Sequence, residues 1–200
     1  MDSSPAVLDW KAELPAIPGR LVALRELTLQ DLGPLVDLFS IGDATRFGLD
    51  DPVTESSVRD LIERVGQNRA AGVSFTYAIT TVSARALIGV IQVRQLEPSF
   101  ETSEWECMIA PSSRGSGAFL EAARLVGTFA FERVGTHRLE ARVVVQNGRA
   151  NGAMRKLGAV QEGILRRSLR RGHEHFDQVL WAILKEDWGD RWVSTAPRVH

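Results

Sequence analysis

A break in one apolar segment constrains this chain more than any other feature. The segment Met108–Ala110 ends a strand-like pattern at Pro111, and the chain then crosses Arg114-Gly-Ser-Gly117 before a helical pattern begins. Two glycines keep side chains away from the turn, and the first N–H groups of the following helix have no acceptor within that helix. The helix dipole adds positive potential at the same end. This order predicts a phosphate or pyrophosphate site, with an ordinary tight turn as the alternative.

Length and composition favour one domain with a sizeable core. The chain has 200 residues, of which 44% are hydrophobic and 24% charged, and its formal net charge is -1. This balance does not predict direct binding to nucleic acid or to an anionic membrane. The longest apolar runs, such as residues 179–184, are far shorter than the roughly 20 residues of a membrane helix. The N-terminal decapeptide lacks the basic lead and apolar core of a secretory signal, so we expect a cytoplasmic protein.

Cysteine and histidine usage gives no reason to expect a metal. The single cysteine, Cys107, lies within a mostly apolar strand pattern, which favours a packed thiol in a reducing compartment over a nucleophile. The four histidines show neither the spacing nor the cysteine and carboxylate neighbours of a zinc site. We therefore expect no metal.

The periodicity predicts a mixed sheet with helices. An arm over residues 1–19 is expected to lie on the surface, a core domain to cover 20–188, and a poorly constrained tail to cover 189–200. In the core, Thr28 and Asp31 suggest a helix cap, and short connectors between the middle strands favour antiparallel pairing. The expected strands are 20–27, 75–80, 86–96, 102–110, 137–145, 159–169 and 174–184, and the expected helices are 28–40, 54–71, the one after the glycine turn, and a short one stopped by Gly158.

Three pieces of sequence, in this order, carry a resemblance to a known family. They are Arg114–Ala122, Leu139–Val143 leading to Asn147, and Asn151–Gly163. The first resembles the pyrophosphate loop of the GNAT superfamily of acyl-CoA-dependent N-acyltransferases, and the other two resemble its pantetheine-binding strand and helix. Over most of the chain the sequence is similar to the Rim-type branch, which acetylates protein N-termini. The resemblance implies a single-domain GNAT-like α/β fold, with a mixed, mostly antiparallel twisted sheet flanked by helices.

The resemblance also implies which residues hold acetyl-CoA. The turn would bind the diphosphate, the backbone of the strand before it would pair with the pantetheine amides, and two asparagines would contact the same arm. An asparagine at a helix start is equally often a simple cap, and a basic helix face is often only solvated. The implied cofactor-binding residues are Met108, Ile109, Ala110, Arg114, Gly115, Ser116, Gly117, Ala118, Phe119, Asn147, Asn151, Met154 and Lys156.

Acetyl transfer to an amine requires a base, because an alkylamine is mostly protonated near neutral pH. Glu104 and Glu106 share one face of the strand that leads to the turn, and Glu140 lies on the strand expected beside it. These are the candidate catalytic bases; the alternative for each is an exposed strand face or an ion pair with Arg142. The general acid has no clear candidate, since Met154 stands where many relatives have a tyrosine.

The acceptor is expected between the loop 42–54 and the hairpin 167–175. Arg46, Phe47, Arg170 and His173 are the candidate substrate-binding residues. The hairpin is basic, which suggests an acidic acceptor, although a solvated basic hairpin has the same composition. The sequence leaves open a protein N-terminus or a small-molecule amine as acceptor, a non-catalytic acyl-CoA-binding module, and a homodimer. A nucleotide-hydrolysing P-loop is a weaker alternative, because the turn lacks the following Gly-Lys-Ser/Thr.

Overall fold

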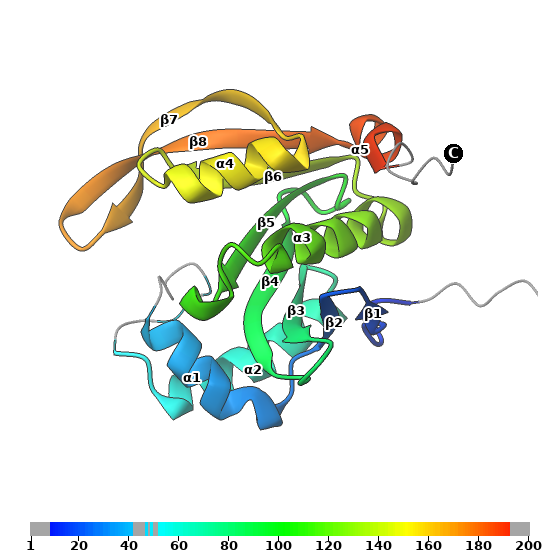
Figure 1. The fold of residues 1–200 in the computed structure, drawn as a ribbon, viewed down its shortest axis with the longest axis vertical. Helices are drawn as coiled ribbons and strands as arrows, with labels where there is room; N and C mark the ends of the chain where they lie inside the picture. The colour runs from blue at the N-terminus through cyan, green and yellow to red at the C-terminus, as the bar shows by residue number, and fades with distance from the viewer. Residues whose placement is uncertain (1–8, 42–46, 48, 50–51, 193–200) are drawn as a thin grey trace, which may run out of the picture. The chain divides into compact units, whose positions relative to one another are not determined.

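The computed structural model describes residues 9–41, 47, 49 and 52–192. It contains an eight-stranded sheet with the strand order β1-β2-β3-β4-β5-β6-β8-β7 (Figure 1). The fold class expected from the sequence, a mixed α/β sheet with helices, is confirmed. The strands are β1 (Ile17–Pro18), β2 (Val22–Glu26), β3 (Ser74–Thr81), β4 (Leu87–Gln95), β5 (Thr102–Ile109), β6 (Arg138–Val144), β7 (Val160–Arg171) and β8 (Glu174–Leu184). The helices are α1 (Leu32–Ser40), α2 (Glu55–Ala70), α3 (Ala118–Phe129), α4 (Gly148–Leu157) and α5 (Lys185–Trp192), with short 3-10 turns η1 (Leu29–Asp31) and η3 (Pro111–Ser113) and a π-helical segment η4 (Ala130–Val134).

The chain forms two compact units. The first holds the described residues up to Val93 together with Cys107–Leu125, and the second holds Arg94–Glu106 and the described residues from Val126 onward. Strands β4 and β5 and helix α3 each contribute residues to both units. The pairings β1–β2, β2–β3, β6–β8 and β7–β8 are antiparallel, whereas β5 pairs with β6 in parallel.

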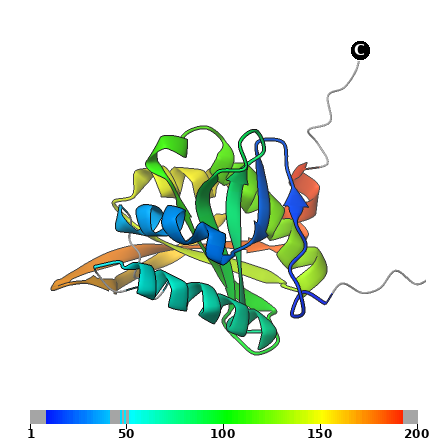
Figure 2. The same ribbon diagram turned by 90° about the horizontal axis from the view of Figure 1, so that it is seen from below.

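The core of the first unit lies under two amphipathic helices. Helices α1 and α2 lie side by side in both ribbon views (Figure 1, Figure 2). Their apolar side chains, three from each helix, pack in one cluster with Val90 of β4 and Met108 of β5. Burial of apolar surface on this scale is the main term that holds such a unit together. The helical members of the cluster are Leu35, Leu38, Phe39, Val58, Leu61 and Ile62.

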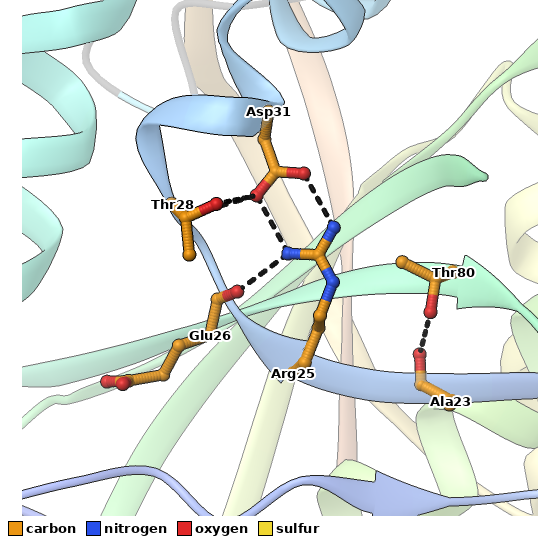
Figure 3. A network of polar contacts seen from close by, with 6 residues as sticks. All are labelled: Ala23, Arg25, Glu26, Thr28, Asp31 and Thr80. Atoms are coloured by element: carbon orange, nitrogen blue, oxygen red, sulfur yellow. Dashed lines mark hydrogen bonds and ion pairs between the residues drawn. The ribbon is translucent and has the colours of Figure 1, made fainter. Parts of the chain in front are cut away.

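A partly buried ion pair fixes the junction between β2 and α1. Arg25 donates two hydrogen bonds to Asp31, at 2.8 and 2.6 Å, and the Thr28 hydroxyl donates to the same carboxylate at 3.3 Å (Figure 3). The carboxylate also accepts from the backbone N–H of Thr28 at 2.9 Å. The cap that Thr28 and Asp31 suggested is therefore confirmed. Burial alone would raise the pKa of Asp31, but the Arg25 and Thr28 hydrogen bonds outweigh it and the net pKa is lowered.

The N-terminal arm is exposed over much of its described part, as expected for a surface location, but two of its side chains are buried. Trp10 and Leu14 are buried, and the Trp10 ring meets Phe75 at a centroid distance of 5.5 Å. Further along the arm, β1 pairs with β2 in an antiparallel register. Proline at an edge strand costs no ladder hydrogen bond when its nitrogen faces outward, so Pro18 is compatible with its place in the edge strand β1.

The second unit is built on β6, β8 and β7. In Figure 1, helix α4 lies along these strands. The long β7–β8 hairpin turns at Gly172, which has φ +57°, as the sequence predicted. Its register shifts between Leu165 and Leu169, so that three residues of β7 oppose Asp177 alone, and Arg167 takes a positive φ at this bulge. Asp177 accepts a hydrogen bond from the Arg167 backbone N–H at 2.7 Å, which stabilises the irregular turn.

Helix α5 was not predicted, and its second half lies in the segment 189–200 that was expected to be a poorly constrained tail. Trp188 anchors it: its indole donates to Thr128 at 3.0 Å, and its ring meets Phe131 at 5.4 Å. Both partners lie about 60 residues away in the sequence, so the local pattern carried little sign of the contact. Gly127 leaves the space that the Trp188 ring fills.

Candidate active site

The glycine turn has the backbone conformation that its sequence predicted. After Ile109 the chain makes the short 3-10 turn η3 and then reaches Gly115 and Gly117, with φ +81° and +90°. These angles lie in the region that side chains disfavour, which is why glycine occupies both positions. A Cβ at Gly115 would meet nothing within 4 Å, so the space beside the turn is open. The Arg114 side chain folds back, with Nε 3.4 Å from the carbonyl oxygen of Ile109.

The turn presents backbone donors without protein acceptors. Ser116 braces it: its hydroxyl donates to the Ser113 carbonyl at 2.8 Å and accepts from the Ala118 N–H at 3.3 Å. Within the described residues, no acceptor pairs with the N–H groups of Gly115, Ser116 or Gly117. Successive free N–H groups at a helix N-terminus form a concave anion site. The turn therefore has the backbone features of such an anion site, and diphosphate binding there stays a prediction.

A carboxylate in the first turn of α3 ties this helix to the start of β2. Glu121 accepts hydrogen bonds from the backbone N–H groups of Arg20, Leu21 and Val22, at 2.9, 2.6 and 2.8 Å. Burial alone would raise the pKa of Glu121, but the three backbone hydrogen bonds outweigh it and the net pKa is lowered. The negative charge is thus compensated by backbone dipoles. The sequence reasoning missed this residue, although an acidic side chain in a helix's first turn was a usable signal.

The strand that leads to the turn leaves its parallel neighbour early. The β5–β6 register joins Thr102–Glu104 to Arg138–Glu140 and stops there, although β5 continues to Ile109 and β6 to Val144. In the first unit, β5 keeps its contact with β4: the Ala110 N–H donates to the Ile88 carbonyl at 2.8 Å. Backbone groups of β5 beyond Glu104 are thus left out of the parallel ladder.

Asn147 and its helix lie in the second unit. Asn147 caps α4, because its side-chain oxygen accepts from the Ala150 N–H at 3.1 Å. Met154 is buried on the same helix, whereas Lys156 is exposed near its end. The cap that the sequence offered as an alternative role for Asn147 is therefore present, and the cofactor contacts expected for these three residues stay predictions.

The Asn151 side chain connects several backbone and side-chain groups of the second unit. Its side-chain NH₂ donates to the carbonyls of Val144, Val145 and Asn147 at 3.0, 3.2 and 3.0 Å. Its oxygen accepts from the Trp181 indole at 2.9 Å. Both amide hydrogens are thus engaged by protein carbonyls, which joins α4 to the end of β6 and to β8. A contact from Asn151 to pantetheine remains a prediction, and it would have to share these donors.

Glu104, one of the three candidate bases, is buried between two guanidinium groups. Its side chain is 2% exposed. Arg94, from the end of β4, contacts Oε2, and Nε of Arg142, from β6, lies 3.4 Å from Oε1. Both arginine side chains are about 40% exposed, at 41% and 40%. The ion pair with Arg142 that the sequence left as an alternative is present, and Arg94 is a partner that the sequence did not indicate.

The other two candidate bases differ in their surroundings. Glu140 is the register partner of Glu104, and it accepts a hydrogen bond from Arg138 at 2.8 Å. Arg138 also donates to Glu162 of β7 at 2.8 Å, so a second ion-pair network crosses the sheet. Glu106 is half-buried and follows Glu104 by two residues, so both side chains point to the same face of β5.

The four candidate acceptor residues lie in different surroundings. Phe47 is buried against Phe39, with ring centroids 5.3 Å apart, and so belongs to the core cluster. Arg46 lies outside the described residues. In the second unit, Arg170 and His173 are exposed near the tip of the β7–β8 hairpin.

The remaining reactive side chain is Cys107. Although the residue is only half-buried, its sulfur is enclosed, and burial raises the pKa of the thiol. A protonated thiol is a poor nucleophile, which agrees with a packed role. In the part of the chain that the structure describes, no three His, Cys, Asp or Glu side chains converge as metal ligands. No helix there has the length and apolar character needed to cross a membrane.

Comparison with known proteins assigns the family. The model of the acetyltransferase (GNAT) domain matches residues 21–160, well over half of the chain. The chain belongs to the GNAT acetyltransferase family. The resemblance seen in the three sequence pieces is thereby confirmed, and the domain is an N-acetyltransferase that uses acetyl-CoA. The probable N-acetyltransferase YjcK of Bacillus subtilis (strain 168) is 28% identical over 139 residues, covering 69% of this GNAT domain chain and 77% of the relative.

Solved structures of enzymes with different acceptors share the fold of this chain. The ribosomal L7/L12 alpha-N-protein acetyltransferase RimL, in complex with coenzyme A, superposes with a TM-score of 0.76 at 18% identity, over 86% of this chain and 99% of that one. A chimera of the spermidine N-acetyltransferase SpeG from Vibrio cholerae gives 0.74 at 19% identity, over 86% and 100%. A Rim-type protein is thus among the structural neighbours, as the sequence resemblance suggested. At these identities the likeness shows the fold alone, so the acceptor must be argued from this chain's own residues.

Proposed function

We propose that this GNAT domain transfers the acetyl group of acetyl-CoA to the α-amine of a protein N-terminus, by direct transfer in a ternary complex. The observation that carries the proposal is the turn at Gly115–Gly117, with its N–H groups free of protein acceptors. The open space beside Gly115 suits a diphosphate, and a Cβ added there would not collide with protein atoms. Acetyl-CoA supplies the activated acyl group as a thioester when it is bound.

The strand before the turn supports the same site. Its backbone leaves the β6 ladder after Glu104, and we propose that backbone groups of Met108 and Ile109 pair with the amides of the pantetheine arm. Asn147 and Asn151, in the second unit, are proposed as further contacts to that chain. These contacts would hold the acetyl group in place beside the bound acceptor, and such positioning can supply much of the rate of a transfer between two bound groups.

We assign the general base to Glu106. The amine must lose a proton before it attacks a carbonyl, and a carboxylate near the reacting atoms can accept it. Glu104 and Glu106 lie on the same strand, β5, whereas Glu140 lies on β6. Glu106 lies two residues closer to the turn on the same face of β5. We assign no side chain as general acid.

Charge favours an N-terminal amine over a polyamine. The β7–β8 hairpin carries six basic side chains within ten residues, and Glu174 is the one carboxylate between them. Such a surface repels a polycation and attracts an acidic peptide, most strongly at low salt. The six residues are Arg166, Arg167, Arg170, Arg171, His173 and His175.

Release of free thiol from acetyl-CoA, measured with a panel of N-terminal peptides, single amino acids and spermidine, tests the function. We expect peptides to be acetylated and spermidine to be a poor acceptor. Glu106→Gln should lower kcat by about a hundredfold or more, with acetyl-CoA affinity retained. If acetyl-CoA binds but no acceptor on the panel releases thiol, the chain is instead a non-catalytic acyl-CoA-binding module.

A charge change in the turn tests the diphosphate site. Gly117→Asp should place a carboxylate against the diphosphate and weaken acetyl-CoA binding by about tenfold or more, measured by titration calorimetry. Gly135→Asp is the matched control, because Gly135 has a similar φ of +97°, has nothing within 4 Å of an added Cβ, and lies after η4. Equal affinities in the two variants would contradict the proposed site.

A further inference from the structure

Leu21 presents an exposed apolar side chain from a firmly held backbone. The residue directly precedes β2 and is 51% exposed. Its N–H donates to the Glu121 carboxylate at 2.6 Å, and its carbonyl accepts from the Val82 N–H at 3.1 Å. Both backbone groups are engaged, so the side chain projects from a fixed point of the first unit. A single exposed leucine is ordinary on a protein surface, and only its surroundings can give it a role.

The Leu21 side chain lies beside the glycine turn. Its Cδ1 is 3.4 Å from the position that a Cβ would occupy at Gly117, which is an ordinary van der Waals distance. A Cβ at Gly115 would meet nothing within 4 Å. Leu21 and both glycines belong to the first unit. The turn therefore has an apolar side chain next to one glycine and open space next to the other.

A second apolar side chain stands opposite Leu21. Strands β2 and β3 are antiparallel, with Val22 opposite Thr81. The hydrogen bond from Val82 to Leu21 continues this register by one pair. Side chains that are opposite in an antiparallel pair lie on the same face, with Cβ atoms about 5 Å apart. Because Val82 is 48% exposed, the two residues form a small exposed apolar surface at the end of the ladder.

Charges near the turn are compatible with an anion beside this surface. The Glu121 carboxylate points at three backbone N–H groups, which compensate its negative charge. Arg20 and Arg114 each add a positive charge close to it in the chain, the first directly before Leu21 and the second directly before Gly115. A ligand that suits this place has an anionic group for the turn and an apolar group next to that anion.

We propose that Leu21 is a further binding residue for acetyl-CoA, and that its side chain packs against an apolar part of the ligand that adjoins the diphosphate. This inference rests on the proposed diphosphate site and deepens it, because the glycine turn accounts for the phosphate groups alone. Two parts of acetyl-CoA have the required chemistry: the adenine ring and the dimethyl group of the pantoyl unit. Packing would remove apolar surface from water and shield the hydrogen bonds of the turn on one side.

Paired leucine substitutions test the contact. Leu21→Ala should weaken acetyl-CoA binding by about threefold to tenfold in titration calorimetry, as expected for the loss of an apolar contact. Leu21→Met keeps most of the apolar volume and should stay within about twofold of wild type. Leu29→Ala is the matched control, because Leu29 is 52% exposed and lies in η1 of the same unit. A Leu21→Ala protein with the affinity of wild type would overturn the proposal.

Fragments of the ligand separate a direct contact from a distortion of the turn. Inorganic pyrophosphate has no apolar part, so its affinity, measured by competition with acetyl-CoA, should be equal in wild type and Leu21→Ala. A loss for pyrophosphate as large as that for acetyl-CoA would indicate a distorted turn and contradict the contact. A loss confined to ADP assigns the contact to adenine, and a loss confined to S-acetyl-4′-phosphopantetheine assigns it to the dimethyl group. A loss for acetyl-CoA that neither fragment reproduces would also overturn the proposal.

Failure of the proposed diphosphate site gives a different result. If that site is wrong, Gly117→Asp and Gly135→Asp bind acetyl-CoA equally well. If only the Leu21 contact is wrong, Gly117→Asp weakens binding while Leu21→Ala does not. The melting temperatures of the Leu21 and Leu29 variants should stay within about 3 °C of wild type, because both side chains are half exposed. Weaker binding by Leu21→Ala would then reflect the missing side chain and not partial unfolding.

Discussion

Removal of the Glu121 carboxylate should destabilise the first unit by an amount that can be worked out bond by bond. The hydrogen bond from Val22 is part-buried, whereas those from Arg20 and Leu21 are exposed. A buried hydrogen bond to a charged group contributes about 1.5–3 kcal/mol, while water can replace the exposed bonds, so about 0.5 kcal/mol each is reasonable. Glu121→Ala should therefore lower the free energy of unfolding by about 2.5–4 kcal/mol.

Urea unfolding followed by circular dichroism measures this free energy. Glu121→Gln keeps one acceptor oxygen and loses the charge, so its loss should be intermediate. Glu132→Ala, an exposed glutamate of η4, is the control and should change the free energy of unfolding by less than about 0.5 kcal/mol. Because Glu121 holds the first turn of α3, the Ala variant should also bind acetyl-CoA more weakly. A Glu121→Ala protein as stable as the control would refute the reasoning.

The difference in unfolding free energy between wild type and Glu121→Gln should change with pH in a defined direction. Since the folded-state pKa of Glu121 is lowered from the ordinary value of 4.5, the charged form is favoured in the folded protein. Its contribution is therefore fully present above the ordinary pKa and is lost as the pH falls through the lowered one. The stability gap between wild type and Glu121→Gln should be constant from about pH 7 to pH 5.5 and shrink below about pH 4.5. A gap that widens on acidification would contradict the hydrogen-bond account.

Two further changes test the packing of the chain. Gly127→Ala should destabilise the protein by about 1–3 kcal/mol in thermal and urea unfolding, because the new Cβ would lie 2.6 Å from the Trp188 ring. Gly66→Ala, on the open face of α2, is the control and should stabilise by about 0.5–1 kcal/mol; stabilisation by both changes would show that the ring moves aside freely. Asn151→Ala should lower the melting temperature and reduce the free energy of unfolding by about 2–3 kcal/mol, because the Trp181 indole and three backbone carbonyls lose this partner. Unchanged stability with weaker acetyl-CoA binding would instead show that Asn151 acts only as a cofactor contact.

Local chemistry explains why much of the fold was readable from sequence. The glycines at 115 and 117 adopt positive φ because the turn requires it, and the same residues expose the donors that define the site. Strand-like segments predicted β2 to β8, and the Thr28–Asp31 cap was recognisable because its partners are three residues apart. Each of these features depends on neighbours in the chain, where pattern and structure are directly linked.

Contacts between distant residues decided the rest. Three features arise only when strands and helices are brought together. Glu121 meets partners about 100 residues away, Arg94 and Arg142 converge on Glu104, and Trp10 becomes buried. The sequence by itself determined the family and the acetyl donor, because the sequence pieces that carry the resemblance are local, and it predicted the anion-binding turn. The tertiary structure decided which cations hold Glu104, since Arg94 and Arg142 reach it from the strands on either side of β5.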